Sequence, residues 1–164
     1  GATINASSNV VGINNGGIHV GTTGTAGKIT INNLAGASVT GKLFAIEVQQ
    51  LGSGGAVSIT TTGALSASAG NGIQVQSNST SASDAVTIVT GGTIKATAAG
   101  ISVTRSGGAG AIDITANGAI SGNRLSRVAS GGSGPAGIYI DEADWKYIRR
   151  HEPVMKAEAQ VETA

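Results

Sequence analysis

Short alternations of apolar and polar residues recur along the chain and predict β-strands. One strand type is built around an Ile and occurs as GIHV (17–20), FAIEV (44–48), GIQV (72–75), GISV (100–103) and GIYI (137–140). Alternation with a period of two places every second side chain on one face of a strand. The residues Ile18, Ile46, Ile73 and Ile101 follow one another at steps of 28, 27 and 28 residues. The chain therefore repeats one structural unit.

Two further strands are predicted within each repeat. The second strand carries the phrases KITI (28–31), AVSI (56–59), AVTI (85–88) and AIDI (111–114). The third strand is centred on Val39, Leu65, Ile94 and Ile120, and Ile4 supplies an earlier member. Each strand is too short to bury its apolar face alone, so strands of successive repeats must stack against one another.

Three short strands per repeat are typical of a β-solenoid. We predict an all-β fold, a right-handed parallel β-helix of about 4–5 turns with a C-terminal helical segment. Successive strands stack in parallel at roughly 4.8 Å, and the right hand follows from the preference of parallel β connections. The pairs Gly91–Gly92 and Gly107–Gly108 are expected at corners, where they permit a positive φ. An antiparallel β-sandwich is the alternative, because it also contains short alternating strands.

The last step of the repeat is longer. Ile101 and Ile138 are 37 residues apart, which predicts an insertion near residues 123–136. Residues 1–140 are accordingly assigned to the β-helix, and residues 141–164 to a helical C-terminal cap or appended helix.

The final segment, 141–164, differs in composition from the repeats. It contains no glycine, holds ten of the nineteen charged residues and includes the only Trp. Asp141 can cap a helix, and Trp145 and Ile148 share one helical face. An amphipathic helix after GIYI is well placed to cover the open end of the solenoid. A dimerising helix, a linker helix and an engineered addition stay open, because GGSGP (131–135) resembles a made linker.

Composition limits the core and the partners. Hydrophobic residues make up 40% of the 164 residues but aromatics only 2%, so the core must be built from Ile, Val, Leu and Ala. A net charge of +1 gives no reason to expect nucleic acid or an acidic membrane as partner. The chain has no Cys and no apolar run long enough for a membrane-spanning helix. It begins at GATINASS without a Met or a leader, so we expect a processed or excised fragment.

Residues suited to catalysis or metal binding are scarce. The repeats offer the carboxylates Glu47, Asp84 and Asp113, which belong to different strands and corners and should not converge on one site. His19 is expected to point outward into solvent, and His151 lies in an unrelated segment without a metal-ligand pattern. We therefore predict no catalytic residue, no metal and no cofactor.

Four motifs are set aside. The glycines Gly132, Gly134 and Gly137 match G-x-G-x-x-G, but a strand follows them where a nucleotide site needs a helix. The segment 107–115 nearly matches a calcium nonapeptide, but Asp113 comes one place late and the motif does not recur. The outward Thr, Ser and Asn residues are too mixed for an ice-binding array. The glycosylation sequons at Asn5 and Asn78 arise easily in such a composition.

The polar loops differ in sequence from repeat to repeat, whereas the strands keep the same apolar pattern. GTTGTAG (21–27), QQLGSGG (49–55), QSNSTSAS (76–83) and TRSGGAG (104–110) all occupy the corner between the first and second strands. They form either a contact surface along one edge or solvated connections.

The phrases GGTIKATAAGISV (91–103) and GAGAIDITANGAISG (108–122) resemble the passenger regions of Gram-negative autotransporters, of the pertactin-like β-helix kind. The resemblance covers residues 1–122 and AGIYI (136–140), and it rests on repeat style without a diagnostic site. It implies type V secretion, a secreted or outer-membrane surface location, and a role as adhesin, virulence factor or stalk.

We therefore expect a non-catalytic passenger fragment that binds a surface protein or glycan of a host or neighbouring cell, with self-association through the solenoid ends or the C-terminal helix also considered. A carbohydrate-active β-helix enzyme, such as a polysaccharide lyase or hydrolase, is the alternative. A purely structural scaffold is the third interpretation.

Overall fold

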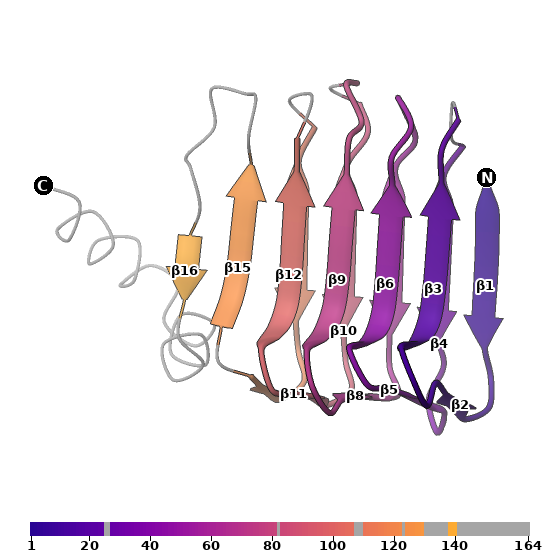
Figure 1. Cartoon of the computed structure of the whole chain (residues 1–164), viewed down its shortest axis with the longest axis vertical. Coiled ribbons are helices and arrows are strands. Elements are labelled where there is room, and N and C mark those ends of the chain that lie inside the picture. Colours follow the sequence, from indigo (N-terminus) through magenta and orange to yellow (C-terminus); the bar gives the residue numbers. More distant parts are fainter. Residues whose placement is uncertain (25–26, 82, 107–109, 123, 130–137, 141–164) are drawn as a thin grey trace, which may run out of the picture.

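The chain coils into a parallel β-solenoid of about four turns (Figure 1). The computed structural model describes residues 1–24, 27–81, 83–106, 110–122, 124–129 and 138–140, and for the last two ranges it describes the strands alone. No helix occurs among these residues. The predicted all-β parallel solenoid is confirmed, whereas the helix predicted over 141–164 lies outside the described residues.

Each turn contributes one strand to each of three sheets. Sheet A contains β1 (Ala2–Ala6), β4 (Ile29–Asn33), β7 (Val57–Thr61), β10 (Val86–Thr90) and β13 (Ile112–Ala116). Sheet B contains β2 (Val10–Val11), β5 (Ser38–Gly41), β8 (Ala64–Ala67), β11 (Ile94–Ala96) and β14 (Ile120–Ser121). Sheet C contains β3 (Gly16–Thr22), β6 (Phe44–Gln50), β9 (Asn71–Ser77), β12 (Ala99–Arg105), β15 (Arg124–Ala129) and β16 (Ile138–Ile140).

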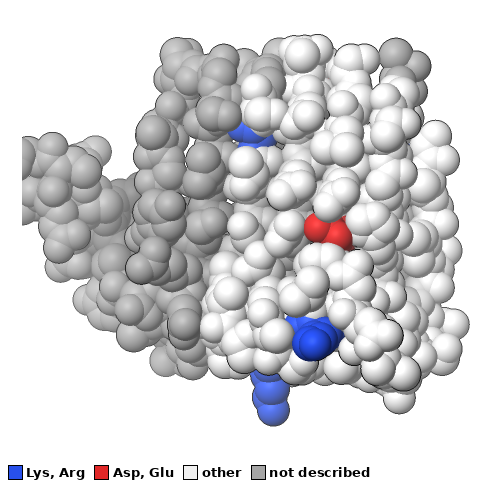
Figure 2. All heavy atoms as spheres, in the orientation of Figure 1, with Lys and Arg blue, Asp and Glu red and all other residues white. Residues whose placement is uncertain are grey.

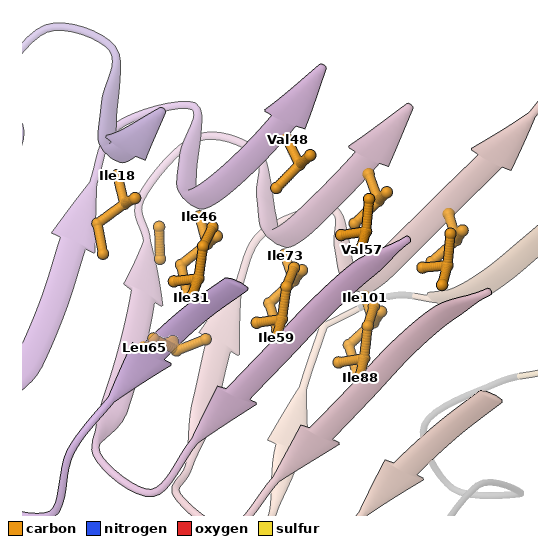
Figure 3. Packing of buried hydrophobic residues seen from close by; sticks show 14 of the residues in the cluster. Ile18, Ile31, Ile46, Val48, Val57, Ile59, Leu65, Ile73, Ile88 and Ile101 are labelled. Carbon is orange, nitrogen blue, oxygen red and sulfur yellow. The ribbon is translucent and has the colours of Figure 1, made fainter. Parts of the chain in front are cut away.

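The core consists of columns of aliphatic side chains that run along the solenoid axis (Figure 3). In sheet C, Ile46 pairs with Ile18 on one side and with Ile73 on the other, and Ile73 pairs with Ile101. The side chains of Ile46, Ile73 and Ile101 have no exposed surface. Burying an Ile side chain contributes about 1.5–3 kcal/mol, so the repeated pattern stabilises every turn against its neighbours.

Glycine precedes the Ile of most first strands because a methyl group at that position would collide with sheet B. A Cβ on Gly72 would lie 2.3 Å from Cγ2 of Ile94, and one on Gly100 would lie 2.1 Å from Cγ2 of Ile120. The ladder between β6 and β9 pairs Phe44 with Asn71 and then Ile46 with Ile73. The small residue between these two positions in each strand has no partner in the ladder. The recurring Gly-Ile phrase thus meets a packing requirement of the interior.

Close packing also explains the glycines between sheets A and B. A Cβ on Gly92 would lie 2.1 Å from the carbonyl oxygen of Gly63, and one on Gly118 would lie 2.0 Å from that of Gly92. A positive φ occurs among the described residues only at Gly36 and Gly55. Gly91–Gly92 lies at a corner between sheets A and B as predicted, but neither glycine uses the positive φ that such a position permits. Gly107–Gly108 lies outside the described residues.

The first turn differs from its predicted assignment. Ile4 lies in β1 of sheet A and pairs with Ile31, so its placement among the third strands is wrong. Val10 of β2 takes that place and pairs with Val39. With only two residues, β2 is too short to show the alternation on which the prediction depends.

The C-terminal end of sheet C also differs. β15 pairs in parallel with β12 and supplies the fifth first strand, within the range 123–136 predicted as an insertion. β16, which contains the GIYI residues 138–140, pairs antiparallel with β15. The placement of GIYI as a parallel rung is therefore wrong, because a matching apolar phrase carries no information on strand direction. The division into residues 1–140 and 141–164 stays a prediction.

Candidate functional site

The loops between sheets C and A stack along one edge of the solenoid. This loop edge comprises the described parts of 23–28, 51–56, 78–85 and 106–111, which protrude together from the ends of the sheet C strands (Figure 1). Backbone hydrogen bonds continue from the strands into it: Asn78 N donates to Gln50 O at 2.8 Å, and Ser106 N donates to Ser77 O at 3.0 Å. The loops therefore begin in register with one another.

A column of polar residues lies inside the solenoid beneath the loop edge. Thr22, Gln50, Ser77 and Arg105 occupy equivalent positions in the β3, β6, β9 and β12 ladder. Gln50, Ser77 and Arg105 are 0%, 1% and 2% exposed. Burying a polar side chain costs free energy unless it forms hydrogen bonds. The hydrogen-bond partners of these residues therefore show how their burial is offset.

Within this column, Gln50 and Ser77 are hydrogen-bonded to each other, and Gln50 also reaches the loop that follows it. Ser77 Oγ donates to Gln50 Oε1 at 2.6 Å. Gln50 Nε2 in turn donates to the carbonyl oxygens of Gly54 and Gly55, at 2.9 and 2.6 Å. The second loop is thus held in place from the interior.

Asp84 joins two neighbouring loops. Its Oδ2 accepts hydrogen bonds from Ser79 Oγ and from the backbone N–H of Gly55, both at 2.7 Å. The hydrogen bond from Ser79, followed by that from Gly55 and by the charge of Arg105, lowers the pKa of Asp84. Arg105 Nη2 donates to the backbone oxygen of Asp84, and burial lowers the pKa of this guanidinium. Part-buried hydrogen bonds, within loop 78–85 and from it to the neighbouring turns, therefore fix the shape of the loop edge.

A second polar cluster lies on the outer face of sheet C. His19 Nδ1 and Glu47 Oε2 are 2.7 Å apart, with side chains 46% and 4% exposed. The other oxygen of Glu47 accepts from Gln49 Nε2 at 2.9 Å and from Gln74 Nε2 at 3.2 Å. Asn71 Nδ2 donates to Gln74 Oε1 at 2.7 Å. The cluster extends over three turns of the solenoid.

The structure places the predicted residues apart from one another. Glu47 lies on the outer face of sheet C, Asp84 in the loop edge and Asp113 in β13 of sheet A. His19 points outward as predicted, but it is paired with Glu47 as well as solvated. His151, Trp145 and Ile148 lie outside the described residues. Within the described ranges no three His, Cys, Asp or Glu residues are grouped as metal ligands.

Charge is sparse on the described surface. Figure 2 shows the sheet C side of the solenoid, where basic and acidic atoms are separated by uncharged residues. In the part of the chain that the structure describes, no helix is long and apolar enough to cross a membrane.

Sequence reasoning did not identify the polar column or the His19–Glu47 pair. A signal for both exists in the repeats. Gln50 follows Ile46 and Val48 at the same spacing of two, which predicts that it points inward. Aligning Ile18 with Ile46 places His19 directly beside Glu47. The hydrogen bonds themselves depend on loop geometry, which the pattern does not contain.

No family model, no curated protein and no solved structure matches this chain. The fold and the geometry of the two clusters therefore carry the functional argument.

Proposed function

We propose that the chain is a secreted or surface-displayed passenger fragment of the autotransporter type, with a right-handed β-helix of the pertactin-like kind. It acts without catalysis, as an adhesin that contacts a host or neighbouring cell or as a structural stalk. The observation that carries the proposal is a regular solenoid whose variable loops are gathered on one edge and held by part-buried hydrogen bonds.

Loops that are held in one conformation, as in the loop edge, are suited to binding a partner molecule. A loop that keeps its shape before binding loses little conformational entropy on contact with a partner. The loop edge presents the exposed side chains of Asn78, Thr80 and Ser83, together with Leu51, which is 51% exposed. Uncharged polar groups around an apolar residue favour a surface glycan or protein over a highly charged partner.

The test is a binding assay with matched surface variants. The labelled full chain is applied to a glycan array and to intact cells, beside Thr80→Arg on the loop edge and Ser121→Arg on sheet B. Both positions are exposed. We expect saturable binding that Thr80→Arg weakens by about tenfold, equivalent to ~1.4 kcal/mol, and that Ser121→Arg leaves unchanged. Equal binding by all three proteins would contradict a role for the loop edge.

Location and the stalk role require a separate measurement. Expression of the full-length protein with an epitope tag, followed by surface labelling of intact cells, should place the tag outside the cell. A tag protected inside the cell would overturn the proposal. Surface labelling without glycan or cell binding would exclude the adhesin role and favour the stalk.

The alternative function is a polysaccharide-active enzyme. The pairing of His19 with Glu47 is the observation that favours it, because a carboxylate-oriented imidazole can act as a general base. Incubation with neutral and acidic polysaccharides tests this alternative. Release of new reducing or unsaturated sugar ends that disappears in His19→Ala would establish catalysis and contradict the non-catalytic role.

A further inference from the structure

Three asparagines of the chain are each followed directly by glycine, in the pairs Asn15–Gly16, Asn71–Gly72 and Asn117–Gly118. Asparagine is chemically labile in such a pair. The backbone nitrogen of the next residue attacks the side-chain amide carbon, which closes a succinimide ring and releases ammonia. Glycine favours this ring closure because it has no Cβ to hinder the attack. Water then opens the ring, so the reaction needs no enzyme, metal or cofactor.

The structure holds the Asn71 side chain in place. Its Nδ2 donates to Gln74 Oε1 at 2.7 Å, and its Oδ1 accepts from the backbone N–H of Ala99 at 3.0 Å. Asn71 and Gly72 both belong to β9, which is paired with β6 on one side and with β12 on the other. The amide carbon of Asn71 therefore turns toward the nitrogen of Gly72 only after these hydrogen bonds break.

Asn15 is exposed, but the peptide that follows it is fixed. The carbonyl oxygen of Asn15 accepts hydrogen bonds from the backbone N–H groups of Lys42 and Leu43, at 2.9 and 2.8 Å. Gly16 begins β3 and lies so close to Phe44 that a Cβ on Gly16 would collide with the ring. Ring closure at Asn15 has to rotate this peptide, so we expect it to be slow in the folded chain.

Asn117 is subject to neither restraint. It is exposed in the corner between β13 and β14, and its side chain makes no hydrogen bond to another described residue. Within the described ranges, the carbonyl oxygen of Asn117 accepts no backbone hydrogen bond and the N–H of Gly118 donates none. In this part of the structure, no hydrogen bond therefore has to break before the nitrogen of Gly118 attacks the Asn117 amide.

The corner at residues 117–119 leaves little room for a longer backbone. These residues alone connect Ala116 to Ile120, which are 6% and 5% exposed and belong to the core. The backbone of Gly118 passes so close to the carbonyl oxygen of Gly92 that a Cβ on Gly118 would collide with it. An isoaspartate carries its side-chain methylene in the main chain, so its formation in this corner would lengthen the connection between the two buried residues.

We propose that Asn117 is a site of spontaneous deamidation, and that its isoaspartate product destabilises the turn formed by β13 and β14. The Gly118 nitrogen bonds to the amide carbon of Asn117, the bond from that carbon to Nδ2 breaks, and ammonia leaves. Hydrolysis of the ring at the side-chain carbonyl gives aspartate. Hydrolysis at the main-chain carbonyl gives isoaspartate, whose peptide bond to Gly118 runs through the side-chain carbon. The site is independent of the loop edge and of the proposed function.

The experiment is incubation of the native full chain in mildly alkaline buffer, beside the same chain unfolded in urea, followed by peptide mass mapping. Exchange of an amide NH2 for OH marks each converted asparagine, and labelling by isoaspartyl methyltransferase identifies isoaspartate. The hydrogen bonds of the Asn71 side chain must open first, so Asn117 should convert at least about tenfold faster than Asn71 in the folded chain.

The unfolded chain is the control, because all three pairs should convert at similar rates once the structure is lost. Equal rates at Asn117 and Asn71 in the folded chain would overturn the proposal. Conversion of Asn117 only after unfolding would overturn it as well.

Two variants separate the effect of the longer backbone from that of the added charge. Asn117→Asp carries the charge on a normal backbone and should keep a urea midpoint close to that of fresh protein. Aged native protein that contains isoaspartate should unfold at a lower urea concentration. Asn117→Gln, whose longer side chain closes a ring far more slowly, should keep its midpoint on ageing. An aged isoaspartate form as stable as Asn117→Asp would contradict the destabilising effect of the product.

Discussion

The carboxylate of Asp84 accepts a hydrogen bond from the backbone N–H of Gly55 at 2.7 Å, and so joins loop 78–85 to the loop of the preceding turn. Ser79 Oγ donates to the same oxygen at 2.7 Å. One charged side chain therefore connects the turn that carries it to its neighbour, at the edge where the loops differ most in sequence.

Asp84 makes the stability of the chain depend on pH. The hydrogen bonds from Ser79 and Gly55 lower the pKa of Asp84 from 3.8 in the folded chain. A depressed folded pKa stabilises the fold above the unfolded pKa, and this contribution is lost as the pH falls through the folded pKa. Urea unfolding of the native chain and of Asp84→Asn should differ most at neutral pH and converge in strongly acidic solution. If the difference in the free energy of unfolding between the native chain and Asp84→Asn were the same at every pH, Asp84 would not be the source of the pH dependence.

The glycine before Ile101 should not tolerate a methyl group. A Cβ on Gly100 would lie 2.1 Å from Cγ2 of Ile120, so Gly100→Ala should lower the free energy of unfolding by about 1–3 kcal/mol through overpacking. Gly21→Ala is the matched control, since its Cβ meets no atom closer than 3.5 Å. This control should be neutral or stabilising by up to about 1 kcal/mol. If denaturant unfolding showed the same change in the free energy of unfolding for Gly100→Ala and Gly21→Ala, the close approach of residue 100 to Ile120 would not limit stability.

The aliphatic columns should carry much of the stability. Ile73 has no exposed surface and pairs with Ile46 and Ile101, so Ile73→Ala should cost about 2–5 kcal/mol. Ile13, which is 81% exposed, provides the control, and Ile13→Ala should change stability by less than about 0.5 kcal/mol. Urea unfolding of both variants beside the native chain checks this comparison. A decrease in the free energy of unfolding of less than about 1 kcal/mol in Ile73→Ala, roughly the value of one buried methylene, would contradict a tightly packed column.

A buried hydroxyl in sheet A should lower stability. Thr61 is 0% exposed, and its Oγ1 has no hydrogen-bond partner in the part of the chain that the structure describes. Thr61→Val keeps the shape of the side chain and removes this unpaired group, so it should raise the free energy of unfolding by ~1 kcal/mol. Thr60→Val on the outer face of β7 is the control and should have little effect. A loss of stability in Thr61→Val would show that the hydroxyl is hydrogen-bonded in solution.

The strands and their inward faces follow from the sequence. Alternation with a period of two identifies which side chains of β6, β9 and β12 point inward, and the spacing of Ile46, Ile73 and Ile101 places them in one column. The physical reason is that a short strand can bury its apolar face only against its copies. Matching apolar residues 27 or 28 positions apart therefore predict both the strand and its neighbour.

Tertiary structure alone decided strand direction, the corner contacts and the polar clusters. GIYI matches the other phrases but pairs antiparallel in β16, since direction depends on the path of the chain and not on which residues are apolar. Gly92 is required by a carbonyl of the turn beside it. Gln50 is held by loop carbonyls, and His19 by a carboxylate 28 positions away. The contacts of Gly92 and His19 form between turns, and the hydrogen bonds of Gln50 depend on the path of its own loop, so the alternation of apolar and polar residues predicts none of these contacts.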